Sequence, residues 1–228
     1  GDRTLADDIR DFIRNRDNKP GNVFLGVCHR LDRPTSGVVV FAKTGKALSR
    51  MNRLFRENRI SKTYWAVTAS VPPGSGAGGA GYGAVPEARS GGRSDGNLSG
   101  DLIHYLKKNE SQNKSYVTGE KSAGAKKAEL HYEVIAGSDR YFLIEVKPQT
   151  GRHHQIRAQL SSIGCPIKGD LKYGFSRSDP GGGIHLHARA VQFPHPVRGG
   201  TVEITAPVPA ERLWQVLEKA ALTDLGKG

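Results

Sequence analysis

Residues 29–37 read HRLDRPTSG and place one carboxylate, that of Asp32, between two arginines at the end of a short apolar run. The apolar run 23–25 precedes this segment and the β-branched run 38–42 follows it, as expected of strands that lead into a buried core. Opposite charges favour the ionised form of an acid. Asp32 therefore fits a nucleophile or a base, and equally the acidic half of an ion pair. Gly37 permits a tight bend or a close approach of two backbones.

The chain is strongly basic and long enough to bury a core of its own. Its 228 residues include 34 Lys and Arg against 22 Asp and Glu, which gives a formal net charge of +12. A balance of this sign favours polyanions through phosphate neutralisation and counterion release. Nucleic acid is therefore the first partner to consider, although charge by itself says nothing about chemistry.

The cysteines and the apolar runs indicate where such a chain resides. Cys28 and Cys165 are the two cysteines, and both lie in apolar or strand-like contexts, which favours a reducing compartment over a disulfide framework. No run reaches the roughly 18 apolar residues that a membrane span requires, and the first residues carry no signal-peptide hydrophobic region. We expect an intracellular protein with no membrane partner, in a bacterial cytoplasm or in an organelle matrix such as that of a mitochondrion.

The periodicity of apolar residues predicts helices and strands along most of the chain. Helical spacing indicates helices over 4–16, 46–58, 154–162 and 210–221. Alternation and β-branched runs indicate strands over 62–70, 128–135, 141–146, 184–193 and 201–206. Strands dominate, hairpin connections recur and regular βαβ alternation is absent. We therefore expect an α+β fold with a mixed, mostly antiparallel sheet and flanking helices.

Residues 71–100 form a long segment that is rich in Gly, Ser, Ala and Pro and poor in apolar anchors. Such a segment cannot bury enough surface to offset its ordering entropy, so we expect a mobile surface loop. Two roles fit it. The composition favours an inert loop, and the alternative is an RNA-contacting arm that carries Arg89 and Arg93.

Five short blocks resemble the signature motifs of the RluA-type RNA pseudouridine synthases, in the same order along the chain. Residues 29–37 resemble the HRLDxxTSG block, 62–66 (KTYWA) the K-x-Y-x-A block and 151–157 (GRHHQIR) the GRxHQIR block. Residues 169–174 (GDLKYG) resemble GDxxYG, and LHA at 186–188 with HP at 195–196 resembles the closing LHA…HP pattern. Five blocks in one order are far more specific than any single short motif.

The resemblance implies the pseudouridine synthase fold, with residues 1–228 as a single catalytic domain and the Gly-rich segment as an insertion. The family pattern also carries a strand and a KPxG-type segment ahead of the first block. This sequence starts too late to contain them, so we expect either an incomplete N-terminus or a sheet that begins one strand short. A further departure lies in the GRxHQIR block, where the family has Thr, Ser or Pro at the position of His153.

The resemblance also implies an activity, the conversion of uridine to pseudouridine, in which uracil leaves the ribose, rotates and reattaches through carbon 5. It gives Asp32 the role of the carboxylate that either attacks the sugar or removes its 2′ proton. It implies that Tyr64 stacks on the target base and handles the proton on carbon 5. A core position is the alternative for this tyrosine. It makes Arg157 the partner of Asp32, with Arg152 as the competing candidate.

RNA recognition is expected from residues in and near the same blocks. By resemblance, Arg30 intrudes where the flipped base was, with a plain phosphate contact as the alternative. Leu186 fits an apolar wall of the pocket and equally a core position. The full set of expected RNA-binding residues is Arg30, Arg33, Thr35, Arg152, His154, Gln155 and Leu186.

We expect neither a metal nor another cofactor. The pairs His153–His154 and His185–His187 could suggest a metal site, but no CxxC, no HExxH and no clustered carboxylates complete a ligand set. The HRLD string also occurs in protein kinases, and here a glycine-rich loop, a strand lysine and a DFG segment are missing.

The sequence therefore predicts an enzyme that modifies a uridine in ribosomal or transfer RNA, with RNA or ribosomal particles as its partner. The alternative from another class is a non-catalytic RNA-binding or ribosome-assembly factor that retains the fold.

Overall fold

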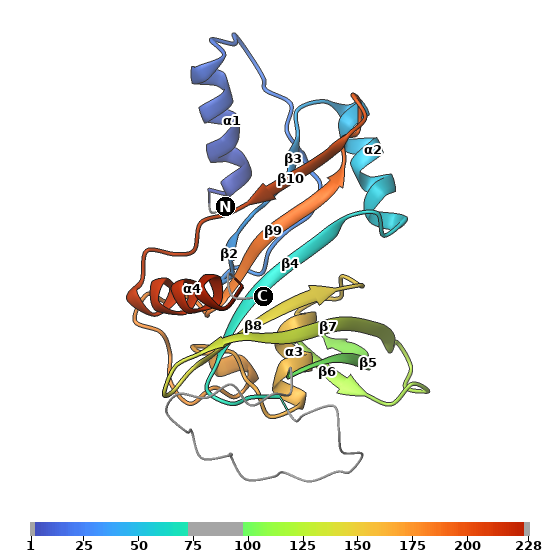
Figure 1. Cartoon of the computed structure of the whole chain (residues 1–228). Helices are drawn as coiled ribbons and strands as arrows, with labels where there is room; N and C mark the ends of the chain where they lie inside the picture. Colours follow the sequence, from blue (N-terminus) through green and yellow to red (C-terminus); the bar gives the residue numbers. More distant parts are fainter. Residues whose placement is uncertain (1–2, 73–97, 226–228) are drawn as a thin grey trace.

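The computed structural model describes residues 3–72 and 98–225 and has one large sheet flanked by helices (Figure 1). In chain order the elements are α1 (Leu5–Arg16), β1 (Gly26–Val27), β2 (Ser36–Gly37), β3 (Phe41–Ala42), α2 (Gly45–Arg56), β4 (Ser61–Thr68), β5 (Ser99–Asn109), β6 (Lys114–Thr118), β7 (Lys126–Gly137), β8 (Phe142–Pro148), α3 (Gln155–Ser162), the 3₁₀ helix η1 (Leu171–Tyr173), β9 (Leu186–Pro194), β10 (Thr201–Thr205) and α4 (Arg212–Leu225). Within these ranges, no helix has the length and apolar character to cross a bilayer.

The large sheet has eight strands, and seven of them follow the order β10-β9-β4-β8-β7-β5-β6. Neighbours along this path are antiparallel. β2 differs, because it pairs with β9 in parallel, and β1 and β3 form a separate two-stranded antiparallel sheet. The predicted α+β fold with a mixed, mostly antiparallel sheet is therefore confirmed.

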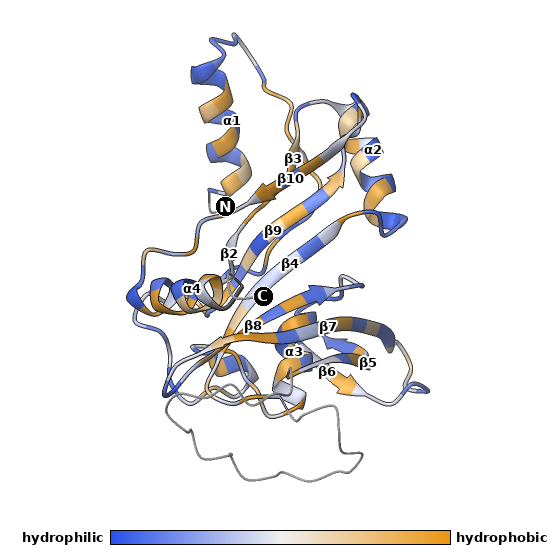
Figure 2. Ribbon diagram, in the orientation of Figure 1, coloured by the Kyte–Doolittle hydropathy of each residue, from blue (hydrophilic) through white to orange (hydrophobic). Residues whose placement is uncertain are grey.

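Helices cover both faces of the sheet, and β4 contributes to the core on each side. Alternate residues of a strand point to opposite faces. Ala66 accordingly packs in one cluster with Ile156 of α3, while Trp65 packs in another with Trp214 of α4. A third cluster joins Met51 of α2 to β9. Figure 2 shows hydrophobic and hydrophilic bands alternating along α1 and β9, the pattern of elements that are buried on one side.

The short strand β2 fixes the end of the HRLDRPTSG segment to β9, on the edge of the sheet that β10 occupies farther along. Ser36 and Gly37 lie opposite His187 and Ala188 of β9. Gly37 has φ +114°, and a Cβ on it would lie 2.6 Å from the backbone nitrogen of Ala188, so only glycine fits. The hydroxyl of Ser36 is also hydrogen-bonded to Nδ1 of His187 at 2.8 Å. The close backbone approach predicted at Gly37 is confirmed.

The predicted helices are all present, with ends that differ by a few residues. Those over 4–16, 46–58, 154–162 and 210–221 correspond to α1, α2, α3 and α4. The strands predicted over 62–70, 128–135, 141–146, 184–193 and 201–206 correspond to β4, β7, β8, β9 and β10.

Two expectations about strands are wrong, and one pair of strands is unforeseen. The buried strand expected over 38–42 shrinks to β3, and Val38 and Val40 are only half-buried beside the α2 cluster. The Gly-rich segment does not extend to residue 100, because Ser99 begins β5. Its part 73–97, with Arg89 and Arg93, lies outside the described residues. The sequence analysis assigned no strand to β5 and β6, which form a hairpin at the edge of the sheet.

Candidate active site

Asp32, Tyr64 and Arg157 come from three distant parts of the chain, and the fold brings them together. Asp32 lies in the loop between β1 and β2, Tyr64 in β4 and Arg157 in α3. Nη1 of Arg157 donates to Oδ2 of Asp32 across 3.3 Å, although 125 residues separate them in sequence. The side chain of Asp32 is 27% exposed and that of Arg157 is 5% exposed. The carboxylate is thus open to a ligand, with a buried guanidinium behind it.

Arg157 is oriented by a second carboxylate, that of the fully buried Asp170. Nε and Nη2 of Arg157 donate to the two carboxylate oxygens of Asp170 across 2.7 and 2.9 Å. The guanidinium also lies over the ring of Tyr173, 4.9 Å from its centroid. A bidentate pair fixes the plane of a guanidinium, so Asp170 determines where the remaining nitrogen meets Asp32.

Tyr64 lies beside Asp32 with its ring against the core on the α3 side. It packs against the cluster that includes Ile156 and Leu186. Burial raises the pKa of its phenol to about 12, and the nearby charge of Asp32 adds to the increase. The hydroxyl is therefore protonated at neutral pH, and no residue in the described ranges is hydrogen-bonded to it. An apolar ring with a free hydroxyl is a suitable surface for an extruded base.

His154, one of the residues expected to bind RNA, is buried next to Asp32. Its Nε2 lies 3.9 Å from Oδ2 of Asp32, and its Nδ1 is hydrogen-bonded to the hydroxyl of Tyr173 at 3.0 Å. His153 stacks on it, with ring centroids 3.8 Å apart. Burial lowers the pKa of His154 to about 4, although the charge of Asp32 opposes this effect. The ring is neutral at pH 7, so the positive charge in contact with Asp32 is that of Arg157.

The arginines that flank Asp32 in sequence do not pair with it, which corrects our expectation. Arg30 and Arg33 are exposed, and neither forms an ion pair with any described residue. The chain turns at this point, where the amide of Thr35 donates to the carbonyl of Asp32 across 2.8 Å. Oγ1 of Thr35 is buried and lacks a hydrogen-bond partner in the described part of the chain. Both flanking guanidinium groups are therefore free for a ligand.

Gln155 and Leu186, two more of the residues expected to bind RNA, are also buried. The carboxamide oxygen of Gln155 accepts two hydrogen bonds, one from the amide of Arg152 at 2.9 Å, and its nitrogen donates to the carbonyl of Glu129. Leu186 is 3% exposed and packs beside Tyr64. Arg152 is exposed, donates to a carbonyl of β7 and does not contact Asp32. Gln155 therefore secures the turn before α3, and Leu186 supports the ring of Tyr64.

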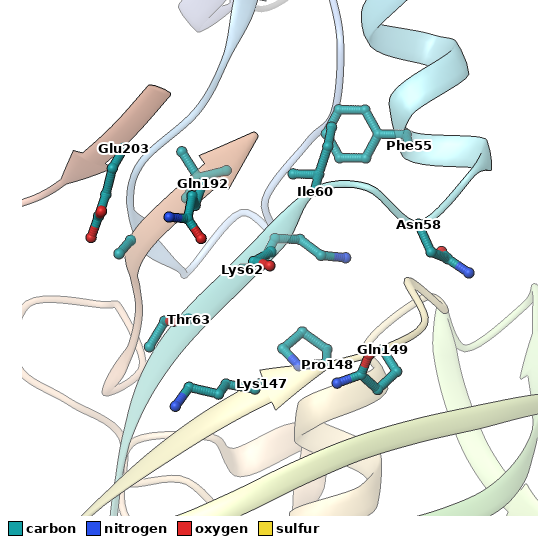
Figure 3. A pocket seen from close by; sticks show the side chains of 13 residues that line it. Phe55, Asn58, Ile60, Lys62, Thr63, Lys147, Pro148, Gln149, Gln192 and Glu203 are labelled. Atoms are coloured by element: carbon teal, nitrogen blue, oxygen red, sulfur yellow. The ribbon is translucent and has the colours of Figure 1, made fainter. Parts of the chain in front are cut away.

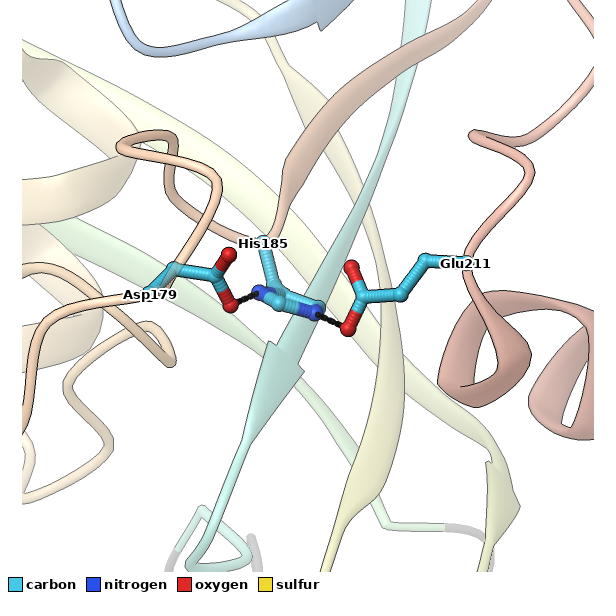
Figure 4. A group of neighbouring side chains, drawn as sticks. All are labelled: Asp179, His185 and Glu211. Atoms are coloured by element: carbon cyan, nitrogen blue, oxygen red, sulfur yellow. Dashed lines mark hydrogen bonds and ion pairs between the residues drawn. The ribbon is translucent and has the colours of Figure 1, made fainter.

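One group of potential metal ligands lies away from these residues, beside the start of α4. Asp179, His185 and Glu211 place their ligand atoms within 4.8 Å of one another (Figure 4). Nζ of Lys168 lies 2.8 Å from Oδ2 of Asp179 and 3.3 Å from Nε2 of His185. The lysine supplies the positive charge that a metal ion would bring. We therefore assign the group to an ion-pair network that ties segment 168–185 to α4.

Two residues of the site, Asp170 and Tyr173, were not predicted from the sequence, although both belong to the GDLKYG block. Tyr173 accepts a hydrogen bond from the amide of Ser115 at 2.8 Å and contacts both Arg157 and His154. The sequence held a signal for Asp170, because this aspartate lies in a block that resembles a family motif and had no role assigned to it. Its partner could not be read from the sequence.

Comparison with known proteins identifies the family. Residues 4–162 match the family model described as RNA pseudouridylate synthase. The tRNA pseudouridine synthase C of Vibrio vulnificus is 33% identical over 200 residues, which cover 83% of this chain and 74% of that protein. The ribosomal large subunit pseudouridine synthase C of Buchnera aphidicola is 31% identical over 197 residues, 83% of this chain and 55% of that protein. The chain spans about half the length of several curated relatives that it matches.

Two solved human structures share the fold. RNA Pseudouridylate Synthase Domain Containing 1 matches with a TM-score of 0.67 and 24% identity, and the match covers 90% of this chain and 76% of that chain. RNA Pseudouridylate Synthase Domain Containing 4 matches with a TM-score of 0.67 and 23% identity, and the match covers 99% of this chain and 85% of that chain. At this identity the likeness supports the fold alone. The sequence matches go further, and together with the motifs around Asp32, Tyr64 and Arg157 they show that the chain belongs to the RNA pseudouridylate synthase family.

Proposed function

We propose that the protein isomerises specific uridines in structured RNA, ribosomal or transfer RNA, to pseudouridine without a cofactor. The observation that best supports this is the partly exposed carboxylate of Asp32, contacted by buried Arg157 and close enough to Tyr64 for its charge to raise the pKa of that phenol. Relatives are named as synthases for both RNA classes, and the net charge of +12 suits either. Residues 1–228 act as a single catalytic domain inside the cell, on free RNA or on ribosomal particles.

In this proposal the chemistry centres on the sugar. The bond between carbon 1′ and the ring nitrogen breaks, the uracil rotates, and carbon 5 bonds to carbon 1′ while its proton is lost and the ring nitrogen gains one. Asp32 either adds to carbon 1′ or removes the 2′ proton, and Arg157 positions its carboxylate. Tyr64 supports the detached base as a neutral phenol, because its pKa of about 12 keeps it protonated before the reaction.

The target uridine must leave its stack before it reaches Asp32, which costs a few kcal/mol. Arg30 is exposed next to the carboxylate and free of any described partner, so it fits the side chain that takes the place of the base. Arg33 is equally free for a phosphate, and Tyr64 forms the apolar wall with support from Leu186. In this proposal the base lies against Tyr64 while the sugar faces Asp32.

The direct test is to incubate the protein with unmodified total RNA and to map pseudouridine chemically. We expect new pseudouridine at discrete positions that are unmodified when heat-inactivated protein is used. Binding of the RNA by correctly folded protein without any new pseudouridine would instead support the non-catalytic RNA-binding or ribosome-assembly factor.

A further inference from the structure

Lys62, two residues before Tyr64 on β4, is a half-buried lysine whose charge is not neutralised by any residue that the structure describes. The partly buried Lys168, by contrast, pairs with Asp179 at 2.8 Å. In the described part of the chain, Lys62 has neither a hydrogen bond nor an ion pair. Burial lowers the pKa of its ammonium, because desolvation disfavours the charged form. A buried cation without a counter-ion is costly, and an anionic ligand would remove that cost.

The side chain of Lys62 points into a cavity that could hold such an anion. The cavity has a volume of about 310 Å³ and lies between the end of α2, the start of β4, the end of β8 and β9. Figure 3 shows the ammonium extending toward Asn58 and Gln149, away from Glu203 on the opposite side. Asn58 and Gln149 are exposed, and their carboxamides form no hydrogen bond with the rest of the described chain. The ammonium of Lys62 and the two side-chain amides therefore line the same end of the cavity.

The other described charged groups near this end of the cavity do not neutralise the charge of Lys62. Lys147 lines the same cavity, but its ammonium pairs with Glu145 at 2.7 Å. His29 lies close enough to feel the charge of Lys62, and burial together with that charge lowers its pKa to about 4, so it is neutral. Glu203 is the carboxylate in the lining, and it lies on the far side. The end around Lys62 thus favours an anion that accepts hydrogen bonds.

The position of Lys62 indicates which anion this is. Two residues of a strand span about 6.6 Å, so a group at Lys62 is adjacent to one at Tyr64. Gly151 lies between the cavity and the active site. A Cβ on this residue would lie 3.8 Å from Nζ of Lys62, and Gly151 is the first residue of the block that ends at Arg157. We propose that Lys62, with Asn58 and Gln149, forms a subsite for the backbone phosphate of a nucleotide adjacent to the reacting one. The proposal rests on the proposed function, since it assumes an RNA whose target base lies at Tyr64.

The test compares Lys62→Gln with Lys62→Arg and with the control Lys147→Gln, which removes a paired lysine of the same cavity. The probe is an unmodified RNA transcript on which the wild-type protein forms pseudouridine, or a short uridine-rich single-stranded RNA if it forms none. We expect Lys62→Gln to weaken binding about tenfold, since a charge-assisted contact is lost. The slope of log affinity against log salt concentration should fall by about 0.7, the value of one single-strand phosphate contact.

The remaining outcomes separate this subsite from other roles. Lys62→Arg should retain the wild-type salt slope, and Lys147→Gln should change it far less than Lys62→Gln does. In turnover assays Lys62→Gln should raise KM and leave kcat near the wild-type value. An unchanged salt slope in folded Lys62→Gln protein, or a loss of kcat alone, would overturn the subsite. If the wild-type protein forms no pseudouridine while the slopes still differ, the proposed activity fails and the phosphate contact stands.

Discussion

At the scale of single residues, the candidate site depends on how one guanidinium is shared between two carboxylates. Two nitrogens of the Arg157 guanidinium bind buried Asp170, and the remaining nitrogen contacts the partly exposed Asp32. A lysine could not reproduce this arrangement, because it has no planar set of donors. The reactive acid is thus positioned by a charge that is itself held in place by the core.

The first prediction concerns Asp32→Asn. The amide is isosteric but neither attacks the sugar nor removes a proton, so pseudouridine formation should disappear. RNA affinity should stay within about threefold of the wild type, because the residues proposed to contact phosphate are unchanged. Pseudouridine mapping and filter binding on the same RNA measure the two quantities. Parallel loss of activity and affinity would show that the carboxylate is structural.

The second prediction concerns Asp170→Asn, which leaves Arg157 without its bidentate partner. Small misplacements of a positioning group cost about 100-fold in rate, so kcat should fall by that order while the Kd for RNA hardly changes. The buried guanidinium also loses its counter-ion, which should lower the free energy of unfolding by about 3 kcal/mol. Urea unfolding and single-turnover assays check both values. The exposed Asp139→Asn is the matched control, and an Asp170→Asn protein with wild-type kcat would contradict the positioning role.

At the scale of elements, the loop that carries Asp32 is placed by the two residues of β2. This strand pairs with β9 in parallel at His187 and Ala188, on the edge that β10 occupies farther along. Short strands gain little from pairing alone, so the fit of Gly37 against the backbone of Ala188 decides the position of the loop. The HRLDRPTSG block that contains Asp32 thus also contains Gly37, the residue that fixes the position of the loop.

The third prediction follows from this contact. Gly37→Ala introduces a Cβ at φ +114°, 2.6 Å from the nitrogen of Ala188, so β2 must move away from β9. We expect a loss of about 2–3 kcal/mol in the free energy of unfolding and a larger proportional loss of activity. Thermal or urea unfolding of Gly37→Ala is compared with Gly45→Ala, at the start of α2, where a Cβ meets nothing within 4 Å. Equal stability of the two variants would refute the docking role of Gly37.

At the scale of the whole molecule, the fold buries histidines in their neutral form. The pKa of His29 and that of His154 are lowered to about 4, in both cases chiefly by burial. Burial also lowers the pKa of four others. The six are His29, His104, His153, His154, His185 and His187. An unfolded chain protonates such groups near their usual value of 6.5, so the two states differ in bound protons below that pH.

The fourth prediction is acid sensitivity with a defined sign. Because the folded pKa values lie below the unfolded ones, the stabilising contribution is complete above pH 6.5 and is lost as pH falls toward 4. A histidine that titrates at about 4 in the fold costs about 2 kcal/mol between pH 7 and pH 5. Urea unfolding at several pH values measures the slope of the free energy of unfolding against pH. His29→Gln should reduce this slope, and a midpoint independent of pH would contradict the prediction.

Local periodicity and motif order determined much of this protein. The helical spacing in 4–16 and the alternation in 128–135 depend on neighbours a few residues apart, and both predictions are confirmed. The motif blocks likewise pointed to Asp32, Tyr64 and Arg157, because a resemblance to a family carries its residues with it. Residues 99–118 were missed since β5 is mostly half-buried or exposed, so its sequence shows little alternation.

Only the tertiary structure decided which charges meet. The sequence placed Arg30 and Arg33 beside Asp32, whereas the fold turned them to solvent and brought Arg157 from 125 residues away. It also set Asp170 behind Arg157 and left Lys62, two residues before Tyr64, without a counter-ion among the residues that the structure describes. The physical reason is that sequence patterns report contacts between near neighbours, while the electrostatic partners of a buried group depend on strand order and on which helix covers which face.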